Sequence, residues 1–345
     1  MTSVDSFNIN LQGTQASQLF LEPIFKSDSI ATNFMVMGNV TGGSKKIKYH
    51  AIVENILKTY SGCGFQANTV TDFTEKEVYL KKLAADMQFC WEDFADILWE
   101  SAYRQGAADW TDLTGTAMQD IFQTLFVNAL VKDINRLAYF GDESSSNVNF
   151  SAVDGMWSVI YPREVAGTRT AKVSLGALVI NGGSPVDRST ASSLASGNGL
   201  EILQQVYDNQ STALYGVADA DKVFNVSRAI YDRYRKDLQS TSVNGENNGT
   251  LIRNGLAVLT FNGIEVVCNP TWTQDAVAAG ITGTTGENFV ELTTRFNKVL
   301  VSNLNGFDFG FRTWFEQKDE KVYIMSRPKV GFDIIHGTLA SVAYK

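Results

Sequence analysis

The sequence is poor in the residues that catalysis and metal binding use most. It has only two histidines, His50 and His336, and three cysteines, Cys63, Cys90 and Cys268, at unrelated spacings. No His or Cys pair has the spacing of a zinc site, and neither histidine has a nucleophile near it in the sequence. An odd number of scattered cysteines favours reduced thiols over a disulfide framework. We therefore expect no catalytic site, no cofactor and no metal centre, and we interpret both histidines as structural.

Positive charge and long apolar runs are scarce as well. The formal charge of the 345-residue chain is −8, and its densest basic cluster is Lys45, Lys46 and Lys48. Specific nucleic-acid binding usually needs a basic patch that releases counterions from phosphates, so we do not expect it here. No apolar run approaches the roughly 18 residues of a membrane span. The N-terminal sequence MTSVDSFNIN lacks the basic and apolar regions of a secretory signal.

The overall composition is that of an ordered globular protein, but the N-terminal segment differs from the rest of the chain. Hydrophobic residues make up 44% of the chain and charged residues 19%, which is typical of an ordered globular protein. The length of 345 residues allows one large domain or two medium ones. Residues 1–33 are instead polar and rich in Gln, Ser, Thr and Asn, with one apolar patch at Leu19, Phe20 and Leu21 before Pro23. Such a segment cannot bury its apolar side chains by itself. We predict an arm that lies on another surface.

The next part of the chain is strand-like and punctuated by glycine. The text FMVMGNVTGGSKKIKYH has two β-prone runs around Gly42 and Gly43, which predicts a long hairpin with its tip at residues 41–46. An extended strand is predicted over residues 78–91, and an amphipathic helix over residues 91–105.

Residues 114–140 carry the strongest helical signal. Apolar residues recur there at steps of three and four: Met118, Ile121, Phe122, Leu125, Phe126, Leu130, Ile134, Leu137 and Ala138. Thr114 or Thr116 can cap the start, and Gly141 stands where a left-handed C-terminal cap is expected. A helix of this length spans roughly 35–40 Å and needs a partner surface along its whole length.

The second half alternates short helices and strands. We expect helices over residues 200–207 and 227–238, strands over 222–226 and 297–303, and a hairpin turning at Asn262-Gly263. A long two-stranded ribbon is predicted over residues 307–327, with its turn at 317–320, and a last strand within 331–345. The aromatic series in the ribbon comprises Phe307, Phe309, Phe311, Trp314 and Phe315. It is either an ordinary sheet face or a contact with neighbouring subunits. The fold class is α+β, with the long helix packed along the ribbon.

Three stretches of the sequence, in their order along the chain, resemble the major capsid proteins of tailed bacteriophages with the Hong Kong 97-like fold. They are INRLAYFGDESSSNVNFSAVDGMW at the end of the long helix, LAVLTFNGIEVVCNP, and the C-terminal text VLVSN followed by FGFRTWFEQKDEKVYIMSRPKVGFDIIHGTL. The resemblance lies in the order of elements and covers nearly the whole chain.

The resemblance implies a division into four parts. Residues 1–33 would be the N-terminal arm and 34–72 the extended hairpin called the E-loop. Residues 73–155 and 306–327 would form the peripheral domain with the long spine helix and the β-ribbon. Residues 156–305 and 328–345 would form the axial domain.

The same resemblance implies a structural protein of the virion and not an enzyme. Such a chain self-assembles as hexamers and pentamers into an icosahedral shell around double-stranded DNA, in the host cytoplasm. Expected partners are further copies of itself, separate scaffolding, portal and decoration proteins, and DNA contacted without sequence specificity. An encapsulin-like shell of a cellular nanocompartment is the alternative. Some relatives crosslink their shells between Lys and Asn with a catalytic Glu; residues 321–327 contain neither Asn nor Glu, which leaves that crosslink unsupported.

Contacts between subunits are expected at two places. The apolar patch of Leu19, Phe20 and Leu21 would dock on an adjacent subunit. The side chains of Lys45, Lys46 and Lys48 would either be solvated or pair with acidic groups of a neighbour.

Overall fold

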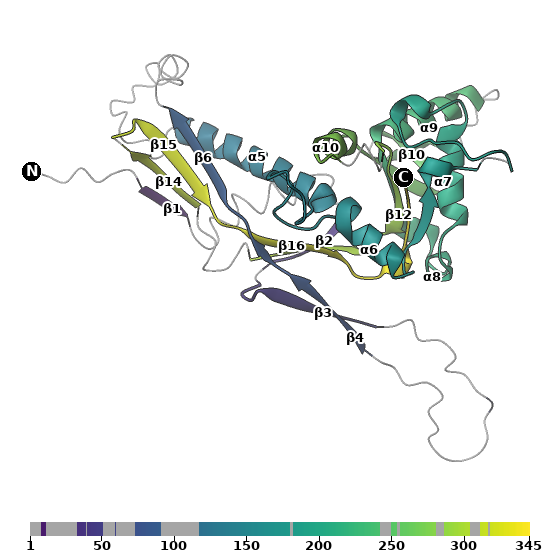
Figure 1. The fold of residues 1–345 in the computed structure, drawn as a ribbon, viewed down its shortest axis with the longest axis horizontal. Helices are drawn as coiled ribbons and strands as arrows, with labels where there is room; N and C mark the ends of the chain where they lie inside the picture. Colours follow the sequence, from purple (N-terminus) through teal and green to yellow (C-terminus); the bar gives the residue numbers. More distant parts are fainter. Residues whose placement is uncertain are drawn as a thin grey trace, which may run out of the picture.

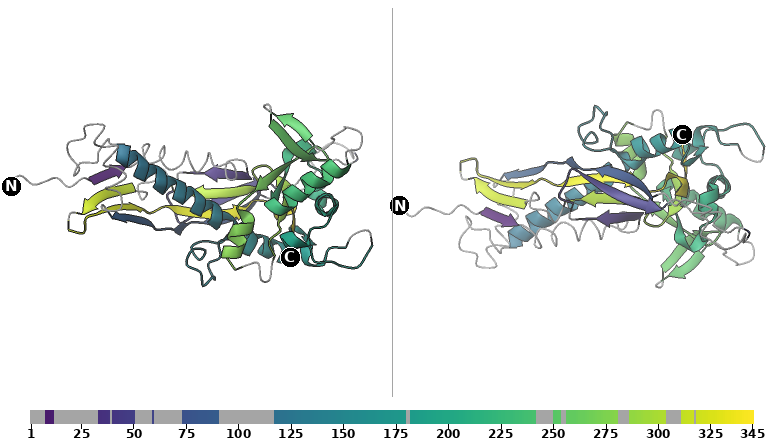
Figure 2. Two further views of the ribbon diagram at one scale, coloured as in Figure 1. Left: turned by 90° about the horizontal axis from the view of Figure 1, so that it is seen from above. Right: turned by 90° about the horizontal axis from the view of Figure 1, so that it is seen from below.

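The computed structural model shows an elongated molecule with three visibly different parts (Figure 1). A compact lobe contains α7, α9 and β12, a long extension contains α5 and the strands β14, β15 and β6, and a narrow ribbon of β3 and β4 projects from the body between them. Two further views show the same elongated outline (Figure 2). The structure describes residues 8–11, 33–38, 40–50, 59, 73–90, 117–179, 182–241, 250–253, 256–280, 286–303, 311–316 and 318–345.

The elements run as follows along the described residues. The α-helices are α5 (Ala117–Phe140), α6 (Tyr161–Ala166), α7 (Asn198–Asp208), α8 (Thr212–Tyr215), α9 (Arg228–Thr241) and α10 (Trp272–Ala278). The strands are β1 (Asn8–Leu11), β2 (Phe34–Met37), β3 (Ser44–His50), β4 (Phe73–Tyr79), β5 (Lys81–Lys82), β6 (Ala85–Cys90), β7 (Ala171–Ser174), β8 (Lys222–Ser227), β9 (Thr250–Arg253), β10 (Leu256–Phe261), β11 (Ile264–Asn269), β12 (Val290–Thr294), β13 (Lys298–Ser302), β14 (Phe311–Glu316), β15 (Lys321–Ser326), β16 (Lys329–Ile334) and β17 (Ala340–Tyr344).

The lobe is built on a seven-stranded mixed sheet in the order β7-β17-β12-β8-β11-β10-β9. Every residue of β8 is buried, because this central strand lies between β11 and β12 and shares an apolar core with α7 and α9. The predicted helices over 200–207 and 227–238 and the strand over 222–226 are confirmed. The hairpin at Asn262-Gly263 is confirmed too: both residues have positive φ, 50° and 82°, as a tight type I′ turn requires.

The extension consists of α5 lying along the sheet β1-β14-β15-β6 (Figure 1). The buried face of α5 includes Phe126, Leu130 and Ile134, and it belongs to the same apolar cluster as Val322 and Ile324 of β15. This confirms that one continuous helix packs along the β14–β15 hairpin. The helix begins at Ala117, and the proposed caps at residues 114 and 116 lie outside the described residues, as do Phe307 and Phe309.

The lobe and the extension share one aromatic core. The ring centroids of Trp157 and Trp272 are 5.2 Å apart, and those of Tyr139 and Trp272 are 5.0 Å apart. Tyr139 comes from the end of α5, and Trp272 from the start of α10. Edge-to-face packing of large rings is stabilising and strongly directional, so the two parts are held as a single body.

Gly141 ends α5 by allowing close packing, and the expected left-handed cap is wrong. Its φ is not among the positive values of the described residues. A Cβ at Gly141 would lie 2.7 Å from the carbonyl oxygen of Leu137 and closer still to that of Val153. Gly155 in turn donates its N–H to the Gly141 carbonyl at 2.8 Å. The helix end and the following loop therefore touch backbone to backbone.

The hairpin predicted around Gly42-Gly43 does not form. Residues 34–37 make β2, which pairs in parallel with β13, while residues 44–50 make β3, which pairs with β4 over residues 73–79. The two β-prone runs thus enter different sheets, and Gly42-Gly43 joins them. Residues 41–46 are therefore at the base of the projecting ribbon and not at its tip. The turn between β3 and β4 lies outside the described residues.

Two other predicted strands are divided in the structure. The extended run over 78–91 becomes β4, β5 and β6, which contribute to three sheets. The C-terminal run over 331–345 becomes β16 and β17, joined by a 3-10 turn at Gly337–Leu339 and lying in different sheets. The helix predicted over 91–105 lies outside the described residues. Among the helices that the structure describes, none has the length and apolar character needed to cross a bilayer.

Candidate functional site

The base of the projecting ribbon is the most distinctive polar site of the molecule. The strands β3 and β4 pair antiparallel from Ser44↔Tyr79 to His50↔Phe73, and within the described residues they form a sheet of their own. Alternation of side chains places Ile47 and Val78 toward the body. These two pack in a small apolar cluster with Val299 and Val301 of β13. The ribbon is thus held by a few apolar side chains at its base.

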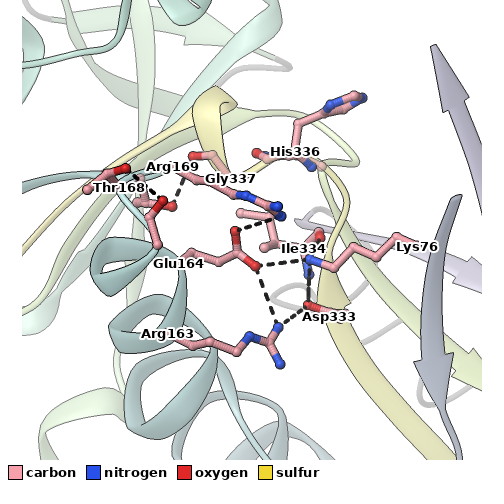
Figure 3. A network of polar contacts seen from close by, with 12 residues as sticks. Lys76, Arg163, Glu164, Thr168, Arg169, Asp333, Ile334, His336 and Gly337 are labelled. Atoms are coloured by element: carbon pink, nitrogen blue, oxygen red, sulfur yellow. Dashed lines mark hydrogen bonds and ion pairs between the residues drawn. The ribbon is translucent and has the colours of Figure 1, made fainter. Parts of the chain in front are cut away.

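A network of ion pairs supplements this small apolar contact (Figure 3). Lys76 Nζ on β4 lies 3.2 Å from Glu164 Oε1 on α6 and 3.0 Å from Asp333 Oδ1 on β16. It also donates to the carbonyl oxygen of Ile334 at 2.5 Å. The exposed fractions of the three charged side chains are 15%, 5% and 10% in the order Lys76, Glu164, Asp333. Charges this well shielded from water interact more strongly than surface pairs.

Two arginines complete the network from the α6 side. Arg163 donates to Asp333 Oδ1 at 2.8 Å, and Arg169 Nη1 lies 3.8 Å from Glu164 Oε2. Gly337 makes room for this arrangement, because a Cβ there would lie 2.6 Å from Glu164 Oε2. Three cations thus surround two carboxylates. The removal of one cation leaves a buried carboxylate less well compensated.

His336 borders the network and packs on the ribbon. Its ring and that of Tyr49 on β3 meet edge to face, with centroids 4.5 Å apart. Burial lowers the pKa of His336, and the positive charge of Lys76 lowers it further. The neutral imidazole therefore fits this site. The side chain of His50 lies outside the described residues.

The lysines singled out in the sequence are on β3, beside the network but not in it. Lys46 and Lys48 are largely exposed and share one partner, Glu75 of the same chain, at 3.7 and 3.3 Å. Lys45 is exposed and stands opposite Val78 in the register. Exposed pairs of this kind contribute about 0–1 kcal/mol each. The ammonium groups therefore stay accessible to a further partner.

Part of the N-terminal segment lies on the molecule itself. Residues 8–11 form β1, which pairs antiparallel with β14 from Asn8↔Trp314 to Leu11↔Phe311. The predicted arm thus adds an edge strand to its own chain's sheet at these four positions. The apolar patch of Leu19, Phe20 and Leu21 lies outside the described residues.

No sequence pattern pointed to the residues that hold the ribbon. The three charged residues Lys76, Glu164 and Asp333 are far apart in the chain. Each lies in a segment whose sequence is ordinary for a strand or a helix. The approach of β4 to β16 and to α6 brings them together. No group of three or more His, Cys, Asp or Glu side chains suited to a metal ion occurs within the part of the chain that the structure describes.

Comparison with known proteins identifies the fold. No protein-family model matches the chain, and no curated protein matches it. Among solved structures, a chain of the satellite phage P4 procapsid including the size determination (Sid) protein aligns with 95% of this chain and 98% of its own, at TM-score 0.57 and 10% identity. The capsid of Myoviridae phage XM1 aligns over 90% of this chain and 89% of its own, at TM-score 0.50 and 12% identity.

These likenesses define the class of fold. The chain is a mixed α+β protein with the Hong Kong 97-like capsid fold that its sequence predicted. At identities of 10% and 12% the comparison concerns the fold alone. What this particular chain does has to be argued from its own geometry.

Proposed function

We propose that this chain is the major capsid protein of a tailed bacteriophage, which self-assembles into the icosahedral shell that encloses the double-stranded DNA genome. The observation that carries the proposal is the projecting β3–β4 ribbon. An isolated two-stranded ribbon is marginally stable in water, and its unpaired edges invite pairing with another chain. Both costs are removed when neighbouring copies cover the ribbon. The fold supports the proposal, because the two structures compared above are a phage procapsid and a phage capsid.

We also propose the four-part division of the chain, with both limits of the E-loop adjusted. The N-terminal arm is residues 1–33. The strand pairing favours an E-loop that begins at β3 and ends at β4, residues 44–79, in place of 34–72. The peripheral domain then comprises the extension, within 80–155 and 306–327, and the axial domain the lobe, within 156–305 and 328–345. Because one core joins the extension and the lobe, both move together while the ribbon has its own attachment.

Contacts between copies are proposed at the ribbon and the arm. Lys45, Lys46 and Lys48 would meet acidic groups of a neighbour. The net charge of −8 makes such groups plentiful on every copy. Leu19, Phe20 and Leu21 would bury apolar surface on an adjacent subunit. Hexamers and pentamers of the chain, with separate scaffolding, portal and decoration proteins, complete the proposed virion. The DNA is contacted without specificity, and the chain performs no catalysis.

Imaging of the purified protein tests the proposal. The full chain is expressed alone, purified, and examined by negative-stain electron microscopy over a range of protein and salt concentrations. Closed, roughly spherical shells are expected, alone or after addition of the scaffolding protein encoded beside the gene. Single chains under every condition would overturn the proposal. An encapsulin-like compartment would also form shells, and the gene neighbourhood separates the two: portal and scaffolding genes support a phage, a cargo-enzyme gene a compartment.

A further inference from the structure

A lysine, a glutamate and an asparagine meet in the interior of the molecule. Lys298 on β13 and Glu291 on β12 are both completely buried, and Lys298 Nζ lies 2.6 Å from Glu291 Oε2. The Nζ atom also lies 5.2 Å from the centre of the Phe34 ring and 5.4 Å from that of Tyr139. The amine is therefore enclosed by one carboxylate and two aromatic rings.

Asn225 presents its carboxamide to the same oxygen. It stands directly opposite Glu291 in the β8–β12 pairing and is completely buried. Its Nδ2 donates to Glu291 Oε2 at 3.1 Å, so the amide and the amine bind one oxygen side by side. Its Oδ1 is buried and accepts no hydrogen bond from the described residues. A buried carbonyl oxygen without a donor is costly in an ordinary core.

The surroundings of Lys298 make its proton easier to remove. Burial lowers the pKa of Lys298, although the neighbouring Glu291 acts in the opposite direction. Tyr161 donates its hydroxyl to Glu291 Oε1. Burial raises the pKa of both Tyr161 and Tyr139 well above the ordinary value, so these phenols stay neutral. Lys298 therefore gives up its proton more readily than an exposed lysine does, and the neighbouring Glu291 carboxylate is placed to receive that proton.

We propose that Lys298 and Asn225 become joined by an isopeptide bond within one chain, with Glu291 as the proton-transfer residue. Glu291 takes a proton from the Lys298 ammonium, and the neutral Nζ attacks Cγ of Asn225. A C–N bond forms, and the carbonyl electron pair moves to Oδ1. Glu291 protonates Nδ2 and removes the extra proton from Nζ. The pair on Oδ1 then restores the carbonyl and the bond from Cγ to Nδ2 breaks. Ammonia leaves with the last proton as ammonium, so Glu291 is again a carboxylate and no oxidant or reductant is needed.

This bond would join two sheets of the same molecule. Asn225 belongs to the seven-stranded sheet and Lys298 to the sheet β2-β13-β16-β5. The reaction uses only residues that the fold of a single chain brings together. It therefore does not depend on shell formation, and its test is independent of the proposed function.

Mass spectrometry of the purified full chain tests the proposal. The intact chain is expected to be lighter than its sequence by one molecule of ammonia. A tryptic digest should contain a branched peptide that joins the segments around residues 225 and 298. Glu291→Gln and Asn225→Ala should restore the full mass and abolish the branched peptide. Asn288→Ala is the matched control, because Asn288 is equally buried but donates to the carbonyl of Arg188; it should keep the ammonia loss.

The wild-type measurement alone decides the matter if a variant fails to fold. An intact chain with the full sequence mass after prolonged incubation, and no branched peptide, would show that the three residues form a buried ion pair and nothing more. Loss of ammonia that persists in Asn225→Ala would place the modification elsewhere and equally overturn the assignment.

Discussion

Lys76 Nζ and Asp333 Oδ1 lie 3.0 Å apart, although the two residues belong to different sheets. Lys76 is part of the projecting ribbon, while Asp333 is part of β16 in the body. The contact therefore ties the ribbon to the rest of the molecule beside its small apolar contact. Because ion pairs can be broken and remade, this attachment suits a ribbon whose surroundings change when copies associate.

The first prediction concerns this attachment. Lys76→Met should destabilise the chain by about 2–4 kcal/mol, because two shielded carboxylates lose a shared cation. Amide hydrogens of β3 and β4 should also exchange faster. Lys48→Met is the matched control, since Lys48 meets one exposed partner and its pair contributes about 0–1 kcal/mol. Urea denaturation and hydrogen exchange measure both effects. Equal behaviour of the two variants would exclude a structural role for the network.

The second prediction concerns the end of α5. Gly141→Ala should destabilise the chain by about 3 kcal/mol or more, because the new methyl group meets backbone oxygens that cannot move freely. At Gly43 a Cβ would meet nothing within 4 Å, so Gly43→Ala should change stability by about 1 kcal/mol or less. Denaturant midpoints of the two variants are the measurement. A Gly141→Ala chain as stable as the Gly43→Ala chain would show that the close approach is not required.

The third prediction concerns pH. The pKa of His336 is lowered from 6.5 by burial and by Lys76, so the folded chain binds this proton less readily than the unfolded chain. Well above pH 6.5 this imidazole is neutral in both the folded and the unfolded chain, and it leaves stability unaffected. As the pH falls below 6.5, the unfolded state gains the proton first, and stability is lost. His336→Gln should therefore reduce the loss of stability between about pH 6.5 and 5. An unchanged slope of unfolding free energy against pH would contradict the lowered pKa.

The fourth prediction concerns the N-terminal arm. Deletion of residues 1–30 should leave a folded subunit, because only β1 contributes described pairing from this segment, and it should weaken or abolish closed shells. Circular dichroism checks the fold, and sedimentation beside the intact chain checks assembly. Shells of normal stability would show that the arm is not a clamp. A chain that fails to fold would place the arm in the core of its own subunit.

Periodicity in the sequence predicted the elements whose apolar side chains face one continuous surface. The helix ending at Phe140 and the hairpin at Asn262-Gly263 are examples, because their signals are local. The order of such elements also predicted the fold. The pairing partners of the strands were harder to predict. The sequence indicated that β3 pairs with β2, but β3 pairs with β4 after more than twenty intervening residues. Alternation of side chains gives the face of a strand but not its neighbour.

The candidate site was even harder to predict from the sequence. The lysines on β3 were visible as a cluster, and they proved to lie on the exposed part of the ribbon. Lys76 lies in the charged strand sequence FTEKEVY, where nothing distinguishes it from the other charged residues. Its role depends on α6 and β16 meeting at one point. A pairwise contact between distant segments leaves no periodic trace in a single sequence.

The central claim is that the projecting ribbon binds neighbouring copies of the chain in a shell. Hydrogen exchange measured on free subunits and on purified particles tests it most directly. We predict that the amides of residues 44–50 and 73–79 exchange quickly in free subunits and slowly in particles, while β8 in the lobe is equally protected in both. Equal protection of the ribbon in the two states would contradict the claim.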